Sequence, residues 1–133
     1  MDERSRRLAR LLAVTEQMKR LEEWRAMQAR LETESRKDRQ RRLLQALDSD
    51  VFRSIALSEV LSRHLRHAAE AVQEAQAREQ KVREILSERH RQTSQIERIR
   101  ERHAEIVRRL QERRDLADVI DMHMQRRADS KRR

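Results

Sequence analysis

The chain contains no glycine, no proline, no cysteine and no tyrosine among its 133 residues, and only Trp24 and Phe52 are aromatic. Because glycine and proline form most tight turns between strands, their absence argues against a β or α/β fold. Without cysteine there is no disulfide, no thiolate ligand for a metal and no thiol nucleophile. With so few large side chains, a compact globular core is not expected.

Charged residues make up 43% of the chain, and 33 basic against 24 acidic side chains leave a net charge of +9 with the two signs interleaved. Such a composition is typical either of disorder or of a long coiled coil, and the two are distinguished by whether an apolar period of about 3.5 residues is present. No run approaches the roughly 18 apolar residues that cross a bilayer, and the N-terminal region does not resemble a signal peptide. We therefore expect a cytoplasmic chain.

The apolar period predicts two helices. In helix one, about residues 4–47, the stripe comprises Leu8, Leu11, Val14, Met18, Leu21, Trp24, Met27 and Leu31, with two consecutive steps of three that shift its phase. The apolar-free segment 32–42 is expected to stay helical, because it consists mostly of good helix formers with Glu32–Arg36 and Asp38–Arg42 at helical spacing.

Three cap-type residues at 48–50 predict a turn over about residues 48–53, followed by helix two over about 54–126. Its predicted seam is Leu61, Leu65, Ala68, Val72, Ala75, Glu79, Val82, Leu86, Arg89, Thr93, Ile96, Ile99, His103, Val107 and Leu110. Steps of three and four over this length indicate a coiled coil. The basic tail, 127–133, loses the period and is expected to fray.

The prediction is thus an all-α single domain, 1–133, formed by a long antiparallel two-helix coiled-coil hairpin with the second helix overhanging. At 1.5 Å per residue the helices span roughly 66 and 110 Å, so helix one reaches only to about Ile96. Exposed apolar residues beyond that point are typical of a docking surface. The candidate partner-binding residues are Ile99, Ile106, Val107, Leu110, Leu116, Val119, Ile120, Met122 and Met124, together with Phe52, Leu57 and Leu61 around the turn.

Other functions have weaker sequence signals. His64 and His67 lie at i and i+3, where two imidazoles could chelate a metal, but no third ligand stands out and surface histidines are the better interpretation. No nucleotide-binding, metalloprotease or cysteine-nucleophile motif is present, so we expect no enzyme, cofactor or metal. The basic clusters 36–42 and 126–133 lack the stacking aromatics that single-strand binding usually adds.

Several segments carry a family resemblance: RLLAV at residues 10–14, EEWR at 22–25, a turn about a third of the way along, and QERRDLADVIDMHMQRR at 111–127. Together they resemble the FliJ/YscO group of type III export-apparatus stalk proteins, most closely at Glu112 to Asp118. The resemblance implies a non-enzymatic stalk that inserts into the hexameric export ATPase and touches the cytoplasmic domain of the export gate. Some family members present aromatic residues around the turn, whereas here Phe52 stands alone.

Two alternatives stay open at this point. The unpaired stripe could meet its own copy in a second chain, which would give a structural homo-oligomer. Less strongly, the chain could be a basic rod that binds nucleic acid through Arg36, Lys37, Arg39, Arg41 and Arg42.

Overall fold

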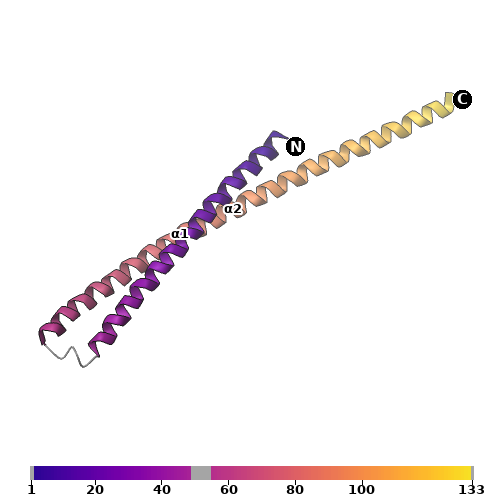
Figure 1. The fold of residues 1–133 in the computed structure, drawn as a ribbon. Helices are drawn as coiled ribbons and strands as arrows, with labels where there is room; N and C mark the ends of the chain where they lie inside the picture. The colour runs from indigo at the N-terminus through magenta and orange to yellow at the C-terminus, as the bar shows by residue number, and fades with distance from the viewer. Residues whose placement is uncertain (1, 49–54, 133) are drawn as a thin grey trace. The chain divides into compact units, whose positions relative to one another are not determined.

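The computed structural model describes residues 2–48 and 55–132 of the chain, with the side chains of 2–48 and 57–132. They form two helices, α1 (Glu3–Leu47) and α2 (Ile55–Arg132), and no strand (Figure 1). The all-α prediction is confirmed. Asp48 follows α1, and its amide donates a hydrogen bond of 3.3 Å to the Leu44 carbonyl. The remainder of the predicted turn, including Phe52, lies outside the described residues.

Helix α1 passes without a break through the apolar-free segment 32–42, as predicted. Arg36 contacts Glu32 at 3.9 Å, while Asp38 pairs with Arg41 at 3.0 Å instead of with Arg42. Both spacings place the two side chains on the same side of a helix. These contacts are solvent-exposed and worth only a few tenths of a kcal/mol each, so the absence of helix breakers contributes more to the continuity of α1.

Helix α2 continues to Arg132, whereas the sequence pattern predicts fraying after Arg126. The lost apolar period was the reason for that prediction, but a helix needs no apolar stripe where nothing packs against it. The segment 127–132 has neither glycine nor proline, and Lys131 and Arg132 occupy the last turn, where cations interact favourably with the free carbonyls.

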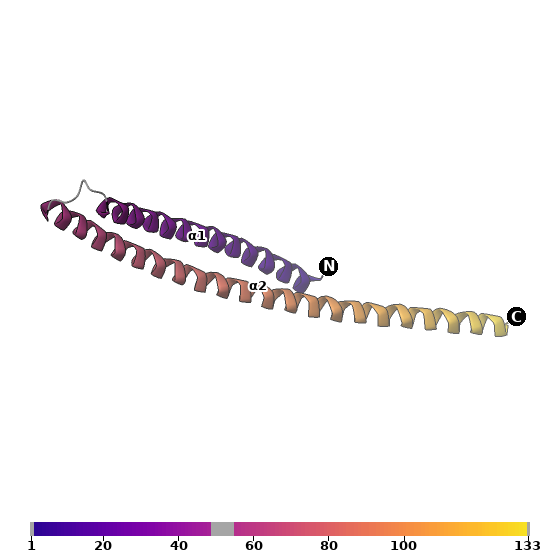
Figure 2. The same cartoon turned by 90° about the horizontal axis from the view of Figure 1, so that it is seen from below.

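Contacts group the residues into two compact units, each formed by one segment of α1 and one of α2. Unit 1 comprises Met1–Val14 and Ser94–Arg133, and unit 2 is Thr15–Thr93. In unit 2 the two helices run antiparallel, because Glu32 contacts Arg78 at 2.8 Å while the earlier Glu23 contacts the later His90 at 3.9 Å. Unit 2 is therefore an antiparallel helical hairpin, and its two helices lie side by side in both views (Figures 1 and 2).

The seam of α2 in unit 2 matches the prediction. All ten predicted positions from Leu61 to Thr93 are buried or partly buried, and the most buried of them is Ala75, which is 1% exposed. The buried side chains are small or medium in size: Leu61, Ala68, Val72, Ala75 and Thr93. The short side chains of Ala68, Val72 and Ala75 allow a second helix to approach closely at those positions.

The predicted stripe of α1 is wrong except at Leu8. Leu11, Val14, Leu21, Trp24, Met27 and Leu31 are exposed, and Met18 is 36% exposed. The observed seam is Leu8, Leu12, Thr15, Lys19, Glu22, Ala26, Ala29, Thr33, Arg36, Gln40, Leu43 and Leu47, all buried or partly buried. This set alternates steps of four and three without interruption, whereas the apolar stripe rotates around the helix between Leu21 and Met27. Only a strict heptad can keep facing the same partner helix.

Candidate partner-binding surfaces

The C-terminal part of α2 in unit 1 is a fully exposed helix. Every residue from Ile106 to Arg132 is exposed, as is Ile99. Nine of the candidate residues lie here: Ile99, Ile106, Val107, Leu110, Leu116, Val119, Ile120, Met122 and Met124. Exposed apolar side chains in this number are what a protein-docking segment requires.

These nine residues do not form one stripe. Ile99, Ile106 and Leu110 follow each other at seven and four residues and share one side of α2. Leu116 comes six residues after Leu110, which rotates it by about 120° around the helix at 100° per residue. Leu116 and Val119 therefore form a second, separate cluster, whereas Ile120 lies only about 40° around the helix from Ile106 and returns to the side of the first cluster.

Charge divides the two clusters as well. The four arginines Arg108, Arg109, Arg113 and Arg114 surround Leu110, whereas the segment 115–124 carries Asp115, Asp118 and Asp121 and no lysine or arginine. Arg108 approaches Glu105 at 2.6 Å, and Arg109 approaches it at 3.2 Å, so part of the basic charge is compensated within the helix. A partner of the first cluster would meet a mainly basic surround, and a partner of the second an acidic one.

The N-terminus of α1 is attached to α2 by Asp2. Its Oδ1 accepts a hydrogen bond of 2.8 Å from the Ser5 amide, which caps α1, and its Oδ2 lies 3.1 Å from Nε2 of His103. Hydrogen bonds from the Ser5 side chain and amide, followed by the one from His103, hold the pKa of the Asp2 carboxyl well below its usual value. His103, predicted to lie on the seam, is thus a partly buried contact residue.

A groove of about 510 Å³ adjoins this contact in unit 1. Ala104 and Val107 are the apolar residues in its lining, and Arg100, Arg108 and Glu112 are charged. Of the nine candidates on the C-terminal helix, Val107 is the one that the structure places in a groove together with α1 residues, namely Asp2 and Ser5.

The candidates near the turn separate in the structure. Leu57 is exposed, as expected of a contact residue, and Val60 beside it is exposed as well. Leu61, in contrast, is buried in the seam of unit 2, so its side chain is not available to a partner in this structure. Phe52 lies outside the described residues.

Sequence reasoning missed an apolar face on unit 2. Trp24 is 59% exposed and, with Leu31, lines a groove of about 600 Å³ whose other residues include Ala29 of α1 and Val82 of α2. The signal is in the sequence, since Trp24 and Leu31 stand out as apolar, but the apolar period predicts them in the stripe of helix one. The uninterrupted heptad of small and polar residues beside them could have corrected the assignment.

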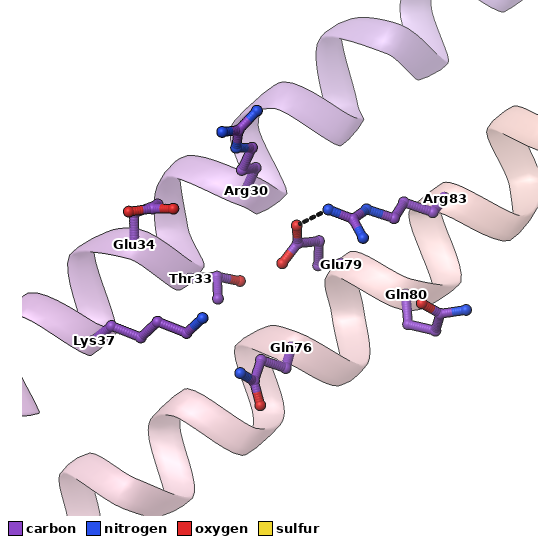
Figure 3. Close-up of a pocket in the computed structure, with 8 residues that line it drawn as sticks. All are labelled: Arg30, Thr33, Glu34, Lys37, Gln76, Glu79, Gln80 and Arg83. Carbon is purple, nitrogen blue, oxygen red and sulfur yellow. Dashed lines mark hydrogen bonds and ion pairs between the residues drawn. The ribbon is translucent and has the colours of Figure 1, made fainter.

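A second groove of unit 2, about 450 Å³, is polar (Figure 3). Glu79 and Arg83 of α2 are joined by an ion pair of 2.8 Å, and Thr33 and Lys37 of α1 lie across from them. Arg30 and Glu34 complete its charged lining. Three basic and two acidic groups nearly balance, so this groove has no strong preference for an anion or a cation.

The other functions considered from the sequence, namely metal binding, nucleic-acid binding and membrane insertion, find little support in the described residues. Among residues 2–48 and 55–132 there is no group of three histidine or carboxylate side chains that could hold a metal ion; His67 lies 3.9 Å from Glu70. In the basic cluster 36–42, Arg36 and Lys37 are partly buried, and Arg41 is paired with Asp38. None of the described helical segments is long and apolar enough to cross a membrane.

Comparisons of the chain with protein-family models, with curated proteins and with solved structures return no match.

Proposed function

We propose that this chain is a non-enzymatic coiled-coil adaptor of a type III export apparatus, flagellar or virulence, that couples the export ATPase to the export gate in the cytoplasm. The observation that carries the proposal is the exposed helix from Ile106 to Arg132, about 40 Å long, with apolar side chains that nothing in the described chain covers. The resemblance of residues 10–14, 22–25 and 111–127 to the FliJ/YscO group supports it.

Coupling of the ATPase to the gate would depend on a stiff helix that presents side chains to the central hole of the hexameric ATPase. Val107 and Leu110 supply apolar contact, and the surrounding arginines attract an acidic wall and orient the helix during encounter. The ATPase contact is therefore assigned to Ile106, Val107 and Leu110.

The second contact, to the gate, belongs at the other end of α2. Leu57 and Val60 are the exposed large apolar residues of α2 nearest to the predicted turn among those described. Since Leu61 is buried, this contact is assigned to the exposed pair and not to the seam. An adaptor needs two separate surfaces, and these two lie on the same continuous helix.

The test is a binding titration of the full chain against a purified hexameric export ATPase. Leu110→Asp should weaken binding by about tenfold or more, because a central apolar contact is replaced by a charge opposed to the expected acidic wall. Leu44→Asp is the matched control, since Leu44 is equally exposed, 48% in both cases, but lies on α1. Circular dichroism should give equal helix content for both variants.

Three results would contradict the proposal: no binding of the unmodified chain, equal binding by Leu110→Asp, or an equal loss with Leu44→Asp. A separate titration against the cytoplasmic domain of the export gate tests the other end. There, Leu57→Asp should weaken binding while Leu110→Asp should not.

A further inference from the structure

Helix α1 carries a second apolar set directly beside its observed seam, in the stretch between Leu8 and Ala26. The observed seam residues of this stretch are Leu12, Thr15, Lys19 and Glu22. Each of them is preceded in the sequence by an apolar residue, namely Leu11, Val14, Met18 and Leu21, and these four are between 36% and 51% exposed. Their spacings of three, four and three are those of a coiled-coil seam. The stretch therefore contains two seams, which differ by one residue, or about 100° around the helix.

The choice between two seams is confined to this stretch. The residue before Leu8 is Arg7, and the residues before the later seam positions Ala26, Ala29 and Thr33 are Arg25, Gln28 and Glu32. On both sides of the stretch the shifted set is thus charged or polar, so the observed seam has no competitor there. A change of seam would rotate residues 9–25 and leave Leu8 and Ala26 in place.

The observed seam is unfavourable in this stretch. Glu22 is 5% exposed, and its Oε2 has no hydrogen-bond partner, although its Oε1 accepts a hydrogen bond of 2.8 Å from Arg25. Lys19 is partly buried in the same seam. Burial of a polar atom without a partner destabilises a packing, whereas burial of Met18 and Leu21 would stabilise one. The second seam would return the charges of Lys19 and Glu22 to water and bury these two apolar side chains instead.

Helix geometry opposes the change. From Leu8 to Ala26 the observed seam advances by steps of four and three alone, whereas the second seam needs steps of three, three, four, three and five. Two consecutive steps of three overwind a helix locally, and a step of five fits a π-bulge. Both distortions weaken the backbone hydrogen bonds of α1, which is a regular helix throughout in the structure. The gain from apolar burial is therefore offset, and the regular helix is the major state.

We propose that residues 9–25 of α1 exchange between two packings against α2: the observed one, and a minor one rotated by one residue, in which Leu11, Val14, Met18 and Leu21 form the seam. Minor states that differ by a few kcal/mol are populated at about 0.1–10%. The exchange is a conformational switch, because a partner that binds the exposed Met18 and Leu21 stabilises the observed packing, whereas one that binds the released charge of Glu22 stabilises the other. The inference does not depend on the adaptor function.

The experiment is NMR relaxation dispersion of the full chain labelled with ¹³C in its methionine methyl groups, which detects exchange on the microsecond-to-millisecond timescale. Met18 is the only methionine in the stretch 9–25. Its methyl group should exchange between the observed environment and a more buried one, or give a second resonance if the exchange is slower. Met27 is the internal control, because it lies on α1 outside the stretch and is 59% exposed; it should show no exchange.

Leu21→Gln tests the second seam, and Leu44→Gln is its matched control. Both leucines lie on α1 and are equally exposed in the observed packing, 47% and 48%, so the two substitutions are equivalent there. In the minor packing Leu21 alone is buried. Leu21→Gln should therefore lower the population of the minor packing by about tenfold, because an amide replaces a buried apolar side chain. Leu44→Gln should leave the population unchanged.

The inference is overturned if Met18 shows no exchange, if Met18 and Met27 exchange alike, or if Leu21→Gln leaves the exchange of Met18 unchanged. Equal exchange at both methionines would indicate opening of the whole hairpin, not a change of seam. Binding to the export ATPase is measured separately, so the absence of exchange in a chain that binds the ATPase would remove the switch and leave the adaptor proposal standing.

Discussion

Glu22 is a carboxylate in the seam of unit 2, and replacing it with leucine should stabilise the hairpin. The residue is 5% exposed; its Oε1 accepts a hydrogen bond of 2.8 Å from Arg25, and its buried Oε2 has no hydrogen-bond partner. A buried polar atom without a partner costs about 1–3 kcal/mol of folding free energy. A seam position of this kind is better served by an apolar side chain.

The magnitude for Glu22→Leu follows from three contributions. Removing the unpaired oxygen recovers about 1–3 kcal/mol, and burying a leucine side chain adds about 1.5–3 kcal/mol at most. Arg25 loses its partner, but its side chain is half exposed, so this loss is below about 1 kcal/mol. Since area-based burial energies are upper estimates, we expect a net gain of about 2 kcal/mol.

Urea unfolding followed by circular dichroism measures this gain. Glu23→Leu is the control, because Glu23 is the exposed neighbour whose contact, to His90, is a long one of 3.9 Å. It should change the free energy of unfolding by less than about 0.5 kcal/mol. Leucine and glutamate have similar helix propensities, so that contribution is small in both variants. A loss of stability in Glu22→Leu, or an equal gain in both variants, would refute the assignment of Glu22 to a dry seam.

Three further predictions concern the packing, the cross-helix ion pair and the N-terminal cap. Ala75→Leu should overpack the seam and lower the free energy of unfolding of unit 2, measured with urea, by about 1–3 kcal/mol. Ala77→Leu, at an exposed position, should leave it nearly unchanged. Equal effects of the two substitutions would contradict the observed seam. A double-mutant cycle between Glu32 and Arg78 should give a coupling energy below about 1 kcal/mol, because both side chains are about half exposed, and a larger value would contradict the solvated geometry. The lowered pKa of Asp2 means that its contribution to stability is present above its unfolded pKa of about 3.9 and is lost as the pH falls towards the folded value. Amide hydrogen exchange near Ser5 should therefore become faster in acid. The same acid response in Asp2→Asn would contradict this.

The fold class was readable from the sequence because it depends on local properties. A chain without glycine or proline, rich in good helix formers, has few alternatives to helix, so even the apolar-free segment 32–42 is helical. The seam of α2 was readable for a similar reason: from Leu61 to Thr93 its apolar and small residues fall on the same alternating steps, so composition and period agree.

The seam of α1 was decided by tertiary packing. Two sets of positions competed on that helix, an apolar stripe containing Leu21 and Trp24 and a strict heptad containing Glu22 and Ala29. Hydrophobicity favours the first set, and a sequence pattern scored by apolar content selects it. Packing against a second long helix requires a constant phase, and only the second set has one.

The candidate partner-binding residues also separate into those predictable from the sequence and those decided by tertiary packing. The exposure of Ile106 and Leu110 followed from helix lengths alone, because α1 is too short to cover them. The burial of Leu61 and the exposure of Trp24 depended on which sides of the two helices meet. The sequence by itself determined that this protein is a pair of long helices with more apolar residues than the seam between them buries. The tertiary structure decided which of those residues face solvent, because the phase of a helix is set by its partner as well as by its own side chains.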